Sequence, residues 1–182
     1  MKQSEIAHLL PGVFQRTVKP GTPLWALLDV MEALHAPSEE VLARLDRYFD
    51  PYQAPDAFVP YLASWVDLER LLTGMVDRLN DATAPTLFPA GLGRLRELIA
   101  AAVFLSRWRG TNKGLIRFLE TATGFQGYTI QEQVLDAGGR PRPFHLLIQA
   151  PAASQPLRPL IQRIIESEKP AYVTYELNFV ES

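Results

Sequence analysis

The stretch "SRWRGTNKGLIRFLETATGF", residues 106–125, decides the fold because it joins two segments of helical periodicity. Gly110 can adopt the left-handed conformation that ends a helix, and Thr111 can cap the next helix through its side-chain oxygen. Gly114 allows the two helices to approach closely, and Gly124 ends the second helix. The sequence therefore predicts a helical corner in which these four residues have structural roles.

Two functional interpretations compete for the same stretch. A phosphate loop of the Walker type needs Gly-x-x-x-x-Gly-Lys-Ser/Thr after a buried strand, whereas here the lysine precedes its glycine and the preceding segment has helical periodicity. A helix-turn-helix fits better, since residues 94–117 carry six basic residues against one acidic residue. A usual DNA-binding unit has a third helix just upstream and a longer turn. A small DNA-binding regulator that uses residues 107–118 is therefore the alternative function.

The composition narrows the class of protein. The chain has 182 residues, of which 47% are hydrophobic and 21% are charged, so it can bury a real core. A net charge of −2 argues against a surface that binds polyanions throughout. No cysteine is present, which excludes disulfides and thiolate nucleophiles. The apolar runs are too short to cross a bilayer and the N-terminus does not resemble a secretory signal, so we expect synthesis in the cytoplasm and no stable membrane insertion.

Side chains that carry chemistry are scattered. His8, His35 and His145 lie far apart, and none stands near a carboxylate at metal-ligand spacing. Neither the Gly-x-Ser-x-Gly motif nor the His-Glu-x-x-His motif occurs. We therefore expect no catalytic, cofactor-binding or metal-binding residues, and no enzyme.

In the first half of the chain, the sequence predicts an extended arm followed by helices. Residues 1–21 contain several Pro and Gly residues, so Val13 and Phe14 must dock on the body or on another chain. A helix is predicted from Pro23 to about residue 35, ended by Pro37, and a second over residues 39–49. Two such helices bury too little surface alone, and the region 22–85 is predicted to join a bundle with other chains. The candidate partner interface comprises Val13, Phe14, Leu24, Leu27, Leu28, Met31, Leu34, Arg107, Arg109 and Lys113.

The second half of the chain, residues 86–182, predicts a small mixed module after the corner. Before this module, in the first half of the chain, a third helix is expected to begin near Asp56 and to run through Leu72. The loop over residues 80–93 is the preferred boundary between the two halves. Helices are predicted over residues 92–107, 112–123 and 155–170. Strands are predicted over residues 128–135, 143–150 and 171–180. The fold class is therefore α+β, with the order strand–strand–helix–strand at the end.

Two positions remain open for the terminal strand "AYVTYELNFV", residues 171–180. At a sheet edge it would be able to pair with another subunit. In the middle of a sheet it would serve only its own domain.

Four short motifs give the chain a family likeness. They are "FDP" at 49–51, "LASWVDL" at 62–68, "RGTNKGL" at 109–115 and "KPAYVTYEL" at 169–177. In this order and spacing the chain resembles the tail protein I family of contractile phages, over about residues 10–179. The branch found in phage-tail-like contractile injection systems is the most similar.

The resemblance implies a structural baseplate wedge subunit. Such a subunit joins two copies of a larger tail protein of the J type through a helical core bundle, followed by a trifurcation-type domain, here residues 86–182. Wedges contact neighbouring wedges, ring the central spike hub and connect to the first sheath layer. The resemblance implies no cofactor, metal or nucleic acid. We expect the wedge to relay the contraction trigger through bistable packing, with Arg107, Arg109, Lys113 and Arg117 free for acidic neighbours.

Overall fold

The computed structural model describes residues 2–72, 88–136 and 138–181. The chain forms two compact units, one ending at Asp50 and the other beginning at Pro51. The sequence predicted a division between residues 85 and 86, and most of the predicted boundary loop over 80–93 lies outside the described residues. The α+β prediction is confirmed, since helices dominate and a three-stranded mixed sheet is present.

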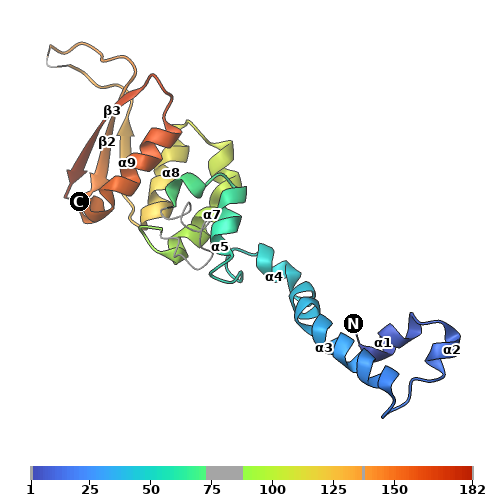
Figure 1. Cartoon of the computed structure of the whole chain (residues 1–182). Helices are drawn as coiled ribbons and strands as arrows, with labels where there is room; N and C mark the ends of the chain where they lie inside the picture. The colour runs from blue at the N-terminus through green and yellow to red at the C-terminus, as the bar shows by residue number, and fades with distance from the viewer. Residues whose placement is uncertain (1, 73–87, 137, 182) are drawn as a thin grey trace. The chain divides into compact units, whose positions relative to one another are not determined.

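The N-terminal unit contains four helices (Figure 1). They are α1 (Gln3–His8), α2 (Gly12–Gln15), α3 (Pro23–Ala43) and α4 (Leu45–Phe49). Helix α1 docks on α3, because the Gln3 amide donates to the Glu32 carboxylate at 2.7 Å and the Gln3 side chain donates to the Trp25 carbonyl at 2.8 Å. The extended arm predicted over residues 1–21 is therefore wrong. Burial of Ile6 stabilises a helix that is too short for periodicity to reveal.

The end of α3 differs from the prediction. Thr22 caps the helix as expected, accepting a hydrogen bond from the Trp25 amide at 3.3 Å. The helix then passes through Pro37, where the sequence predicted its end, and continues to Ala43. Proline removes one backbone donor, but the residues that follow, which include Glu39, are good helix formers. A break occurs at Arg44 instead, and α4 begins at the next residue.

The C-terminal unit begins with a helical layer. It contains α5 (Val59–Trp65), the 3-10 turn η1 (Glu69–Leu71), α7 (Leu92–Arg107) and α8 (Asn112–Thr123). The bounds predicted for the last two helices are confirmed. The predicted helix through Leu72 is wrong, since α5 ends where Val66 and the left-handed Asp67 (φ 60°) turn the backbone.

A small sheet completes this unit, with β1 (Thr129–Gln131), β2 (His145–Pro151) and β3 (Thr174–Val180) in that order. Strand β2 pairs with β1 in antiparallel fashion and with β3 in parallel fashion. The connection from β2 to β3 runs through η2 (Ala152–Leu157) and α9 (Arg158–Glu168), and α8 and α9 lie on one side of the sheet (Figure 1). Strand β1 is shorter than predicted, because the chain leaves the sheet after Gln131.

The core of the C-terminal unit lies between the sheet and its helices. It includes the fully buried side chains Leu98, Leu119, Ile148, Ile161 and Ile164. Because these residues come from α7, α8, β2 and α9, the corner between α7 and α8 is fixed against the same core as the sheet.

Candidate functional site: assembly surfaces

The corner between α7 and α8 is a tight backbone crossing. Gly110 has a positive φ of 73° and Gly124, at the end of α8, has one of 77°. The Thr111 hydroxyl donates to the Trp108 carbonyl at 2.7 Å and accepts from the Gly114 amide at 3.1 Å. A Cβ atom added at Gly114 would stand 2.0 Å from the Trp108 carbonyl oxygen. Backbone geometry thus accounts for each of the four corner residues.

The expectation of free cations at the corner covered four residues, and it is wrong for Arg109 and Lys113. The Arg109 guanidinium lies 3.1 Å from the Asp67 carboxylate. The Lys113 ammonium lies 4.5 Å from the centroid of the Trp108 ring, a cation–π contact. Arg107 is exposed and makes no ion pair with any described residue. Sequence spacing did not reveal the pairing of Arg109, because Asp67 is 42 residues away.

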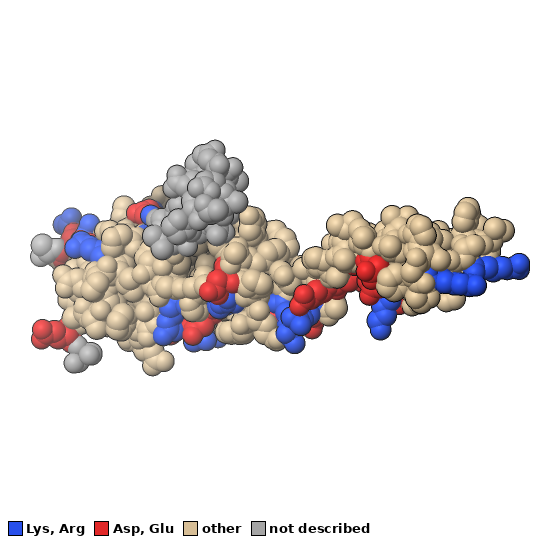
Figure 2. Space-filling model, turned by 60° about the horizontal axis from the view of Figure 1, so that its bottom comes forward, with Lys and Arg blue, Asp and Glu red and all other residues tan. Residues whose placement is uncertain are grey.

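The remaining basic residues of the segment 94–117 are also partly engaged. Arg94 pairs with Glu97 at 2.6 Å, and Arg96 pairs with Asp56 at 2.6 Å. Figure 2 shows acidic and basic side chains next to each other on the visible face of the C-terminal unit. With Arg109, ion pairs thus engage three of the six basic residues of the segment, which makes it a poorer match to the basic face that a DNA-binding helix needs.

An ion cluster that the sequence did not predict ties the corner to the end of α9. Arg70 donates to the Glu168 carboxylate at 2.7 Å, across 98 residues of sequence, and also donates to Asp67. Arg109 reaches the same Glu168 at 3.6 Å. The Nε atom of Arg70 is buried and has no hydrogen-bond partner among the described residues. No local pattern marks such a cluster, since its members come from the α5–η1 segment, η1, the corner and α9.

The two carboxylates of this cluster differ in their protonation behaviour. The Glu168 side chain is only 7% exposed, and this burial raises its pKa, although Arg109 and Arg70 oppose the shift. The hydrogen bond from Arg70 is the largest influence on Asp67 and lowers the pKa of that exposed carboxyl. In this cluster, the charged form of the buried Glu168 is therefore disfavoured, whereas the charged form of the exposed Asp67 is favoured.

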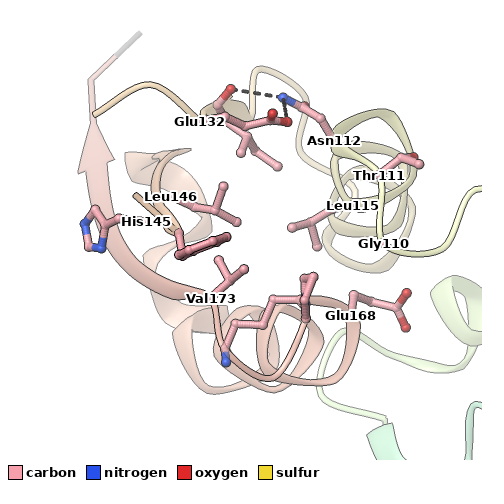
Figure 3. A pocket seen from close by; sticks show the side chains of 13 residues that line it. Gly110, Thr111, Asn112, Leu115, Glu132, His145, Leu146, Glu168 and Val173 are labelled. Carbon is pink, nitrogen blue, oxygen red and sulfur yellow. Dashed lines mark hydrogen bonds between the residues drawn. The ribbon is translucent and has the colours of Figure 1, made fainter. Parts of the chain in front are cut away.

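A pocket of about 300 Å³ lies between α8, the sheet and the segment that joins α9 to β3. Leu115, Leu146 and Val173 converge on it, whereas the His145 ring and the Glu168 carboxylate point away from it (Figure 3). His145 instead lies 2.7 Å from the Thr174 hydroxyl. The lining is mainly apolar.

In the described ranges 2–72, 88–136 and 138–181, no group of three or more His, Asp and Glu side chains is placed to hold a metal ion. Over the same residues, no helix combines the length and the apolar character that a bilayer-spanning segment needs.

The N-terminal unit exposes most of the predicted partner interface. Val13 is 74% exposed and Leu34 is 73% exposed, while Phe14 and Leu27 are each more than half exposed. Leu24 and Met31 are half-buried. Leu28 was predicted to face a partner, but it is 1% exposed and packs inside the unit, because α1 covers that side of α3.

The exposed apolar surface extends beyond the predicted residues. Leu27, Val30, Leu34 and Val41 follow one another along α3 at spacings of a heptad repeat. Figure 2 shows that uncharged side chains make up most of the visible face of this unit. The further exposed apolar residues in the unit are Leu9, Leu42, Leu45 and Phe49. The prediction missed Val30 because it followed the face of the helix that contains Leu28, and it missed Val41 because it ended that helix at Pro37.

Comparison with known proteins gives the family. The model of the family described as "Phage tail protein (Tail_P2_I)" matches residues 25–172, which is most of the chain. No curated protein matches the sequence. The match includes all but the first two residues of α3, contains the corner and reaches the segment just before β3. The chain therefore belongs to the Tail_P2_I phage tail protein family, and it is a structural component of a tail particle that assembles with other tail proteins.

Proposed function

We propose that the chain is a baseplate wedge subunit of a contractile tail or contractile injection system, where it links the spike hub to the sheath. The observation that carries the proposal is the exposed apolar surface of α3, formed by Leu27, Val30, Leu34 and Val41. Soluble proteins rarely leave so many large apolar side chains in water without a partner. The proposal assigns this member of the tail protein family to a particular place in the particle.

The spacing of these side chains favours helices as the partner. Residues that repeat every seven positions form one seam along a helix, and such a seam packs against other helices in a bundle. Full burial of each apolar side chain contributes about 1.5–3 kcal/mol. A partner that covers the seam therefore gains this free energy for each side chain that it buries, and the free-energy cost of association is subtracted from the sum.

The proposed partner is a larger tail protein of the J type, with two copies for each copy of this chain. The N-terminal unit would enter the core bundle, and the C-terminal unit would form the trifurcation-type domain. Neighbouring wedges, the spike hub and the first sheath layer complete the contacts. Before contraction the wedges hold one mutual arrangement, and attachment shifts them to another through their interfaces.

Co-expression with the J-type protein of the same particle tests this proposal. The wild-type chain should purify as a stable 1:2 complex, and the double variant Leu27→Glu/Leu34→Glu should lose it. Val103→Glu is the matched control, because Val103 is 83% exposed on α7 and lies outside the seam. Survival of the complex in the double variant, or its absence in the wild type, contradicts the proposal.

The relay of the trigger needs a separate experiment. The chain contains no cysteine, so a pair of cysteines introduced at a contact between wedges forms the only disulfide that involves it. Electron microscopy of cross-linked particles should show extended sheaths after triggering, and reduction should restore contraction. Normal contraction in the cross-linked state would refute the relay.

A further inference from the structure

We propose that the open edge of β3 accepts an extended strand from a neighbouring tail subunit, which adds a fourth strand to the sheet. This inference concerns the C-terminal unit and does not depend on the wedge proposal, which rests on α3. Strand addition at a sheet edge is a common form of recognition, because the main chain itself provides the hydrogen bonds.

The backbone of β3 presents unpaired groups along this edge. The Thr174 amide donates to the Phe144 carbonyl at 2.9 Å, so Thr174 faces β2. The N–H and C=O groups of successive strand residues point alternately to the two sides. Tyr175, Leu177 and Phe179 therefore direct both of their backbone groups away from β2, and no described strand pairs with that side.

The opposite edge of the sheet is protected. Strand β1 has only three residues, and the side chain of Asn112 on α8 donates to the Ile130 carbonyl at 3.1 Å. Natural proteins close their edges by such devices, or with proline, lysine and bulges. The seven residues of β3, "TYELNFV", contain no proline, glycine or lysine, and Glu176 is the single charged residue. Among the strands of the described residues, β3 alone thus has the length and the open backbone that a further strand requires.

The side chains beside this edge restrict what can bind. Tyr175, Leu177 and Phe179 are half-buried on the α9 side of the sheet and alternate with exposed residues. An incoming strand therefore needs apolar residues on that side to extend the core. Arg158 of α9 lies 5.9 Å from the centroid of the Phe179 ring and makes no ion pair with any described residue. An acidic residue on the strand opposite Phe179 would complement this charge.

A second copy of this chain fits the edge less well. If two β3 strands paired antiparallel about Leu177, Phe179 would face Tyr175 of the other copy. Glu166, the carboxylate that acts on Tyr175, already pairs with Lys169 at 3.2 Å. Arg158 would then meet no free carboxylate. A strand from a different tail protein, apolar on alternate positions and acidic at the Phe179 end, fits better.

Backbone amide exchange tests strand addition without knowledge of the partner. In the isolated chain, the amides of Tyr175, Leu177 and Phe179 should exchange faster than those of Glu176 and Asn178, which face β2. In the assembled particle the outward amides should slow by at least about tenfold, while the inward ones change little. Outward amides that exchange equally fast in the particle and in the isolated chain overturn the proposal.

A pair of variants and a cross-link complete the test. Leu177→Pro removes an outward N–H, whereas Leu177→Ala removes only side-chain contacts. Incorporation into particles should be at least about tenfold lower for the proline variant. If that variant fails to fold, a photoreactive residue at Asn178 gives the answer on a folded chain. Cross-links to a different tail protein support the proposal, and cross-links to a second copy, or none, overturn it.

Discussion

The carbonyl oxygen of Trp108 lies only 2.0 Å from the position that a Cβ atom on residue 114 would take. Real Cβ contacts are almost never shorter than 3.0 Å, and the obstacle here is backbone rather than a movable side chain. The crossing of α7 and α8 therefore requires glycine at 114. Because both helices contribute to the core, their angle sets the position of the sheet relative to α7.

Replacement of Gly114 by alanine should destabilise the C-terminal unit by about 1–3 kcal/mol, because the backbones must separate. Gly93→Ala is the matched control. Gly93 lies in α7 with open space around it, so alanine should stabilise by about 0.5–1 kcal/mol. Urea unfolding of both variants measures the difference. Equal stabilities would mean that the corner relaxes without cost.

Thr111→Val should cost about 1 kcal/mol, because valine loses both the bond to the Trp108 carbonyl and the cap on the Gly114 amide. Serine retains the hydroxyl, so Thr111→Ser should cost much less. Thermal unfolding of the two variants separates the hydroxyl from the methyl group. A serine variant as unstable as the valine variant would assign the effect to packing instead.

Gly114→Leu should impair particle assembly more than Lys113→Ala. The leucine displaces α8 from α7, whereas loss of the lysine removes one exposed cation–π contact worth about 0.5–1 kcal/mol. Quantification of each variant in purified particles gives the result. A phosphate or DNA site at the corner predicts the reverse order.

Glu168→Gln should become relatively more stable than the wild type as pH rises. Burial raises the Glu168 pKa above 4.5, so above that pH the folded chain retains a proton that the unfolded chain has released. Wild-type stability therefore falls through this window, and the variant has no such titration. Urea unfolding between about pH 4 and pH 7 measures the difference.

Asp67→Asn provides the control of opposite sign. The lowered pKa of Asp67 gives the wild type stability that is present above pH 3.8 and is lost as pH falls below it. The advantage of the wild type over this variant should therefore shrink in acid. The same trend for Glu168 and Asp67 would show that burial does not dominate at Glu168.

Salt dependence tests the DNA-binding alternative. Because Arg109 and Lys113 are engaged within the chain, we expect only weak binding of duplex DNA. Tight binding that falls steeply with salt and disappears in Arg107, Arg109 and Lys113 variants would restore that alternative.

The sequence predicted those parts of the fold that local chemistry determines. The positive φ at Gly110, the cap at Thr111 and the bounds of α7 and α8 depend on residues a few positions apart. The order of strands and helices after the corner followed from the change of periodicity. Each of these features can be recognised within a short window of residues.

The remainder depends on contacts between distant residues. Arg70 and Glu168 are 98 residues apart, so no motif indicates their pairing. The burial of Leu28 depends on α1, which the sequence pattern did not predict as a helix. The passage of α3 through Pro37 depends on a balance of small energies that a single breaker residue does not decide.

Pro37 also gives α3 a mechanical property. The proline has no N–H to bond the Ala33 carbonyl, so the helix has one weak link between Leu34 and Val41, two of its exposed apolar residues. A helix bends most easily at such a link. If α3 binds helices of other subunits as proposed, a load along α3 would bend it there first, and the angle between the segments on either side would change.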